Sequence, residues 1–175
     1  MNFYKKNFVC LFVVFSIFSF LEGCKPDKVV IEETPPISER TIEKFSIAQT
    51  EDGKLKMMLE AESADIDENE NSANLELPEV KFYDKGKYSS TLVAERAIIN
   101  LKTYDVKGIG KCVIDTANNE RLETTDLMYN AKRSWLYSDN DVKVKRPGQT
   151  IYGKGFNADT KLQKITIKKQ RMVIN

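Results

Sequence analysis

Short alternations of apolar and polar residues fill the chain from about Thr41 onward, and turn signals separate them. A period of two is typical of β-strands that bury one face. The alternation recurs at Leu55-Met57-Leu59-Ala61, Val80-Phe82, Leu92-Ala94, Ile99-Leu101, Cys112-Ile114, Val142-Val144, Ile165-Ile167 and Met172-Ile174. The turn signals are Glu51-Asp52-Gly53, Glu68–Ser72, Asp84-Lys85-Gly86, Ala117–Glu120, Ser138–Asp141 and Pro147-Gly148. Because no amphipathic helix pattern accompanies them, the sequence predicts an all-β, antiparallel meander.

An internal repeat organises these predicted strands. A shift of 30 residues overlays Leu92–Ile114 on Leu122–Val144 without a gap. An earlier copy begins at Leu59, and a shorter fourth copy runs from Ile151 to Ile165. One such unit cannot bury its apolar face alone, whereas stacked units can. The repeat therefore predicts a twisted open roll of short repeated strands, an antiparallel β-roll or β-jellyroll rather than a closed barrel.

The N-terminus carries an export signal. Lys5 and Lys6 precede the apolar run Phe8–Leu21, whose 14 residues are too few for a ~30 Å hydrocarbon core. The following residues Leu21-Glu22-Gly23-Cys24 resemble the lipobox of bacterial lipoproteins, and this implies cleavage and lipidation at Cys24. The alternative is an uncleaved anchor helix with Cys24 as an ordinary thiol. Both alternatives tether the remaining chain to a membrane, outside the cytoplasm.

The composition divides the chain into three parts. We expect a lipoprotein signal peptide or anchor at residues 1–23, a tether at 24–41 that contains three of the five prolines, and one β domain at 42–175. Cys10 would leave with the signal and Cys24 would carry lipid, so Cys112 stands alone and no disulfide is expected. Cys112 lies on an apolar strand face, which favours a buried small hydrophobe over a reactive thiol.

The charge balance and the missing histidine exclude several functions. Removal of residues 1–23 leaves 25 basic and 25 acidic residues, so nucleic acid is not an expected partner. The chain contains no histidine, which excludes Ser-His and Cys-His catalysis and every histidine-containing metal site. No carboxylate pair stands out as a glycosidase pair. We therefore expect no enzyme activity, no cofactor and no metal.

Two segments imitate ligand-binding motifs without completing them. Asp65, Asp67, Asn69 and Glu76 have calcium-loop spacing, but Glu70 replaces the glycine of the sharp turn, which favours a solvated turn. The segment Gly148–Gly155 nearly matches the phosphate-loop motif. However, Gly155 replaces the Ser or Thr that would hold magnesium, and no helix pattern follows. Its glycines, Gly153 and Gly155, indicate instead a bulge or the close approach of a ligand or another backbone.

Aromatic residues gather at Tyr129, Trp135 and Tyr137. Core or rim packing explains such a cluster more simply than a binding site does.

The recurring pattern Leu-x-Ala-x-x-Ala, an apolar pair and a turn resembles the OstA/LptC superfamily of lipopolysaccharide transport. The C-terminal half carries the resemblance best, in Leu122–Tyr129, Asp141–Val144 and Ile151–Ala158. The resemblance covers roughly residues 42–175, and a membrane-tethered, single-domain chain of this size is most similar to the LptC branch. It implies a non-catalytic protein at the periplasmic face of the inner membrane. Such a protein accepts lipopolysaccharide from the permease subunits of an ABC transporter and passes it to a soluble LptA-like bridge protein.

Acyl chains would bind an apolar trough between the strands, at about 0.8 kcal/mol per buried CH2. The candidate inward-facing residues are Leu59, Leu75, Phe82, Leu92, Ile99, Tyr129, Val144, Gly153, Phe156 and Ile167. The C-terminal strand Ile165–Ile174 is expected to pair edge to edge with the bridge protein, and the strand around Phe45 and Ile47 with the transporter. The alternative function is a structural envelope lipoprotein with a dry β core and no cargo.

Overall fold

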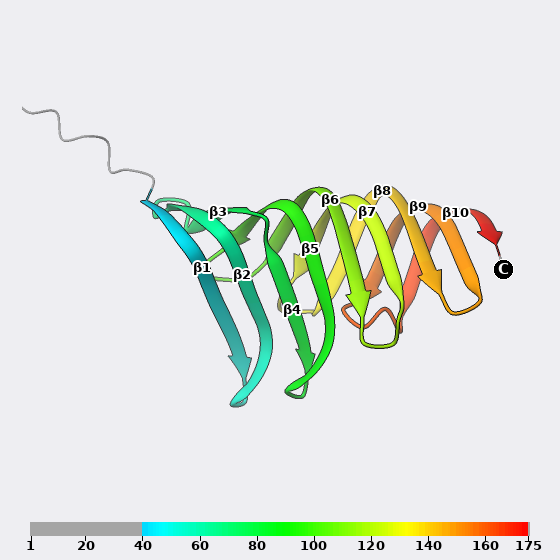
Figure 1. Cartoon of the computed structure of the whole chain (residues 1–175), viewed down its shortest axis with the longest axis horizontal. Coiled ribbons are helices and arrows are strands. Elements are labelled where there is room, and N and C mark those ends of the chain that lie inside the picture. Colours follow the sequence, from blue (N-terminus) through cyan, green and yellow to red (C-terminus); the bar gives the residue numbers. More distant parts are fainter. Residues whose placement is uncertain (1–39, 175) are drawn as a thin grey trace, which may run out of the picture. The chain divides into compact units, whose positions relative to one another are not determined.

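Residues 40–174 form one antiparallel β-sheet in the computed structural model, which describes this part of the chain (Figure 1). The strand order is sequential, β1-β2-β3-β5-β6-β7-β8-β9-β10, and β4 pairs with both β2 and β5. The all-β meander expected from the alternation is confirmed. The strands are β1 (Arg40–Glu51), β2 (Lys54–Asp67), β3 (Ser72–Glu76), β4 (Glu79–Asp84), β5 (Lys87–Asn100), β6 (Val106–Thr116), β7 (Arg121–Asn130), β8 (Trp135–Arg146), β9 (Gln149–Asp159) and β10 (Ile165–Ile174).

Most strands are long and bend in the middle, so that the two halves of each strand belong to two facing walls (Figure 1). The bends coincide with register shifts between neighbouring strands, for example between Ala94 and Arg96 in β5 and between Gly108 and Lys111 in β6. A β-bulge bends the strand that carries it. β3 and β4 together occupy the position of one bent strand between β2 and β5. The strand is interrupted at Leu77-Pro78, where Leu77 has a φ of 47°. Many of the short strands expected from the sequence are therefore halves of long, bent strands.

One predicted turn is wrong. Ser138–Asp141 reads as a turn, yet β8 continues from Trp135 to Arg146 and only its register shifts there. The polar side chains serve the bend: Ser138 Oγ donates a hydrogen bond to the Asp126 carbonyl at 2.7 Å, and Asn140 Nδ2 donates to the Thr125 carbonyl at 2.6 Å. They satisfy backbone groups that the bulge leaves without a strand partner.

Each wall carries a continuous row of cross-strand apolar pairs. In the first wall the row is Ile47, Leu59, Val80, Leu92, Ile114, Leu122, Val144 and Ile151. In the second wall it is Ile66, Ala73, Ile99, Val106, Tyr129, Leu136, Ala158 and Ile165. The 30-residue repeat now has a structural meaning, because it relates residues in the same row two strands apart. The two rows face each other and form the core.

Candidate functional site

The space between the two walls is the candidate ligand site, and side chains from both walls fill it. Phe82 of β4 and Tyr129 of β7 meet across it, with ring centroids 4.7 Å apart and planes tilted by 52°. Both side chains are 1% exposed. Burial raises the pKa of the Tyr129 phenol to about 12, so the ring stays neutral. The interior is therefore apolar and uncharged at this contact, and a ligand would have to part the walls.

The structure places the sequence-predicted lining residues in or against this core. Ile167 is partly buried and packs against the core cluster, because β10 is an edge strand of the described sheet. The other nine are buried: Leu59, Leu75, Phe82, Leu92, Ile99, Tyr129, Val144, Gly153 and Phe156. That these residues bind lipid remains a prediction. Cys24, the predicted lipidation site, lies outside the described residues.

The predicted aromatic cluster is not a cluster. Tyr129 points into the core, whereas Trp135 and Tyr137 are 36% and 41% exposed on the outer face of β8. The alternation along β8 explains the error, because Leu136 takes the inward position between them and pairs with Tyr129. Trp135 and Tyr137 line a hollow on the outside of the second wall.

The two glycines of β9 sit where β10 approaches. A Cβ atom on Gly153 would lie 2.3 Å from Ile167 Cγ2 and 2.9 Å from the Lys169 carbonyl oxygen. Gly155 has a φ of 74°, and a Cβ there would meet the Lys168 side chain. Of the readings left open by the sequence, the structure therefore shows the close approach of a neighbouring strand at Gly153.

Cys112 is fully buried at the bend of β6. Burial raises the pKa of its thiol to about 11, and the nearby Asp126 carboxylate adds to the shift. A protonated, inaccessible thiol is a poor nucleophile. Cys112 therefore acts as a small hydrophobic residue of the core.

The calcium-like segment forms a tight turn. Asp67 Oδ1 accepts the backbone N–H groups of Asn69 and Glu70 at 2.8 and 3.1 Å. Within residues 40–174, no group of three or more cysteine, aspartate or glutamate side chains is arranged to hold a metal ion. The segment Gly148–Gly155 lies in the turn before β9 and in β9 itself.

The open side of the roll is a slit between the turns of the first wall and the loops of the second. Residues 160–164, the β9–β10 loop, bridge it. Ser90 Oγ of the first wall donates a hydrogen bond to the Thr160 carbonyl at 2.5 Å, and Arg146 Nη2 donates to the Leu162 carbonyl at 2.6 Å. Lys161 Nζ pairs with Asp84 Oδ2 at 3.0 Å. The Leu162 side chain is 0% exposed and belongs to the core cluster.

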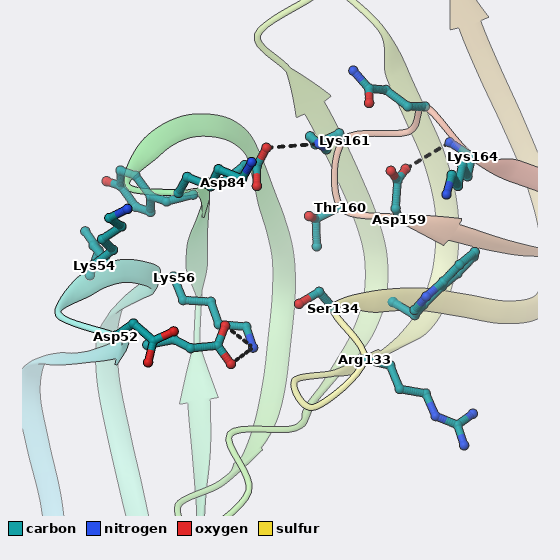
Figure 2. A pocket seen from close by; sticks show the side chains of 16 residues that line it. Asp52, Lys54, Lys56, Asp84, Arg133, Ser134, Asp159, Thr160, Lys161 and Lys164 are labelled. Carbon is teal, nitrogen blue, oxygen red and sulfur yellow. Dashed lines mark hydrogen bonds and ion pairs between the residues drawn. The ribbon is translucent and has the colours of Figure 1, made fainter.

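Beside this loop the slit widens into a cavity of about 610 Å³ (Figure 2). Its rim joins the β1–β2 and β4–β5 turns of the first wall to the β7–β8 turn and the β9–β10 loop of the second. The lining is strongly charged: Glu51 Oε2 and Lys56 Nζ pair at 3.3 Å, and Asp84 pairs with Lys161. The sequence analysis did not predict this cavity, which is the mouth of the slit, or the loop beside it. The signal that could have indicated them is Leu162, a lone apolar residue in the polar run 159–164.

Two strands form the edges of the described sheet. Among residues 40–174, β1 pairs only with β2, and β10 pairs only with β9. On β10, Lys168 and Arg171 form ion pairs with Asp139 and Asp141 of β8. Two large apolar side chains near its end are exposed, Met172 at 57% and Val173 at 38%. Each edge presents an unpaired row of backbone groups to a further strand.

The residues that the structure describes include no helix long and apolar enough to cross a membrane.

The fold is an antiparallel β-jellyroll with an apolar interior, and comparison with known proteins shows the family to which it belongs. The profile of the LptC family, described as "Lipopolysaccharide-assembly, LptC-related", matches residues 8–174. The chain belongs to this family, and its role lies in lipopolysaccharide transport and cell-envelope biogenesis in the periplasm. No protein among the curated sequences matches it.

A solved structure shares the fold. It is LptH of Pseudomonas aeruginosa, described as the LptA-homologous periplasmic component of the conserved lipopolysaccharide transport device. The match has a TM-score of 0.51 and 16% identity, and it covers 65% of this chain and 82% of LptH.

Proposed function

We propose that this protein accepts lipopolysaccharide from an inner-membrane ABC transporter and passes it to a soluble bridge protein for assembly in the outer membrane. The observation that carries the proposal is the pair of continuous apolar rows that face each other across an open-sided roll. A chain that lies between the rows meets apolar side chains along the whole sheet. A ten-carbon acyl chain buried there would gain roughly 8 kcal/mol, at ~0.8 kcal/mol per CH2, so no catalysis is needed.

The sheet edges suit the two handover steps. β10 would pair with the bridge protein and β1 with the transporter by β-augmentation, which would extend the two rows from one protein into the next. We further propose the division into a signal or anchor at residues 1–23, a tether at 24–41 and the roll at 42–175. The lipidated Cys24 or a retained N-terminal helix would hold the roll at the periplasmic face of the inner membrane.

A second candidate function is supported by the packing of the interior. Phe82 and Tyr129 are in contact and almost wholly buried, as they would be in a structural envelope protein with a dry core. The two functions differ in whether the walls part for an acyl chain.

Photo-crosslinking tests this difference. Purified protein with p-benzoylphenylalanine at Phe82 is irradiated with lipopolysaccharide, and the same residue at the outward-facing Tyr137 serves as the matched control. Transport predicts lipopolysaccharide adducts at Phe82 and few at Tyr137. A folded protein with no adducts at Phe82 would support the dry core.

A further inference from the structure

The β9–β10 loop, residues 160–164, inserts one apolar side chain into the roll. Leu162 is 0% exposed, whereas its neighbours Gln163 and Lys164 are exposed. Leu162 also has a φ of 56°, in the left-handed region that a branched apolar residue rarely adopts. The loop therefore takes an unfavourable backbone conformation in order to bury this side chain between the walls.

Few contacts hold the loop across the slit. Besides Leu162 itself, they are the hydrogen bonds from Ser90 and Arg146 to loop carbonyls and the ion pair between Lys161 and Asp84. The ion pair is half-exposed, and pairs of this kind contribute little to stability. The hydrogen bonds of Asp159 with Leu162 and Lys164 lie within the segment and can move with it. Opening therefore breaks only the contacts across the slit and costs less free energy than unfolding the whole domain.

The loop also has space to move into. Thr160, Lys161, Gln163 and Lys164 form one side of the cavity at the mouth of the slit. Figure 2 shows Thr160 and Lys161 at this side, with the ion pair to Asp84 reaching over to the opposite wall. Once that ion pair and the hydrogen bonds from Ser90 and Arg146 break, the loop can swing into the cavity and withdraw Leu162.

We propose that Leu162 fills an acyl-chain site at the mouth of the slit, and that an acyl chain of the lipid replaces it when the loop opens. This inference rests on the proposed function and adds the place where the chain enters the roll. The isobutyl group of Leu162 is branched and apolar, so the space it leaves suits a saturated hydrocarbon chain and excludes a charged group. In the closed form, burial of Leu162 stabilises the protein. In the open form, burial of the longer acyl chain replaces that stabilisation.

Charge reversal across the slit tests the inference. Asp84→Lys sets two lysines against each other and should open the loop, whereas Asp84→Lys combined with Lys161→Asp restores an ion pair. Asp139→Lys, which breaks the exposed pair with Lys168 on the outer face, is the matched control. The probe is a diazirine-bearing palmitic acid, whose crosslinking to the full-length protein is followed with time. Hydrogen exchange of the loop amides is measured on the same samples.

The expected result is about tenfold faster crosslinking and faster loop exchange in Asp84→Lys. The swapped variant should return to the wild-type rate, and Asp139→Lys should stay there. The inference is overturned if Asp84→Lys exchanges faster in the loop without faster crosslinking, or if Asp139→Lys has the same effect. In either case, undiminished crosslinking to the interior would leave the proposed function standing. Absence of crosslinking in every variant and in the wild type would overturn both.

Discussion

Phe82 and Tyr129 lie on opposite walls of the roll, 47 positions apart in the chain, and their rings meet 4.7 Å apart in the core. This contact joins the first wall to the second, because Tyr129 belongs to the second apolar row and Phe82 lies two residues from Val80 of the first. The contact therefore holds the two walls together, and it must give way if a lipid chain passes between them.

Truncation of Phe82 should destabilise the domain strongly. Phe82→Ala removes a fully buried ring and leaves Tyr129 facing a cavity, so the free energy of unfolding should fall by about 3–5 kcal/mol. Urea titration followed by tyrosine and tryptophan fluorescence measures the loss. Tyr137→Ala, on the outer face, should change it by no more than about 0.5 kcal/mol. Equal effects of the two variants would contradict the assignment of inner and outer faces.

Much of this architecture follows from the sequence, because the period of two and the 30-residue repeat mark the inward positions. Leu92, Leu122 and Val144 could be assigned to one face before their strand partners were known. The positions of the bends could not be predicted from the sequence, because no single residue type marks them. Glycine marks the bend in β9 at Gly155, but in β7 the residue with positive φ is Asp126, whose carboxylate accepts the Gly110 N–H at 2.7 Å.

The mouth of the slit was harder to predict, since it depends on contacts between segments far apart in sequence. Asp84 meets Lys161 only because the walls fold over each other. Local patterns also suggested an aromatic cluster that strand alternation divides between the two faces. Sequence patterns thus indicate which side chains point inward, whereas closure across the slit requires the three-dimensional fold.

Gly153 should be intolerant of a side chain. Gly153→Ala would place a methyl group against Ile167 and the Lys169 carbonyl, so β10 should move away from β9. Overpacking of this kind costs about 1–3 kcal/mol. Hydrogen exchange should rise selectively in β10, and the proposed binding of the bridge protein to this strand should weaken. Asn157→Ala, an exposed position on the same strand, is the control, and unchanged exchange in Gly153→Ala would argue against the close approach.

The Cys112 thiol makes stability depend on pH in alkaline solution. Its pKa lies near 11 in the folded state, above the ordinary value of 9.0, so the fold favours the neutral thiol. This contribution is fully present below about pH 9 and is lost as pH rises toward 11, at up to about 1.4 kcal/mol per pH unit. Urea titrations from pH 8 to 11 should show a steeper decline for the wild type than for Cys112→Ala. Parallel curves would show that the thiol is not desolvated.

The exposed apolar residues of β10 should matter for partner binding more than for folding. Met172→Asp places a charge on a side chain that is 57% exposed, so stability should change by no more than about 0.5 kcal/mol. Affinity for the bridge protein should fall about tenfold or more, as measured by biolayer interferometry. Leu77→Asp, equally exposed but far from this edge, is the control. Unchanged affinity in Met172→Asp would move the interface away from the end of β10.

The central claim is that lipopolysaccharide passes between the two walls with energy from the transporter. The most direct measurement places p-benzoylphenylalanine at Phe156, which is 0% exposed on the inner face of β9, in cells that carry an active or an inactivated transporter ATPase. The account predicts lipopolysaccharide adducts at Phe156 that depend on ATP hydrolysis. A folded, correctly exported protein with no adducts, or with equal adducts when the ATPase is inactive, would contradict it.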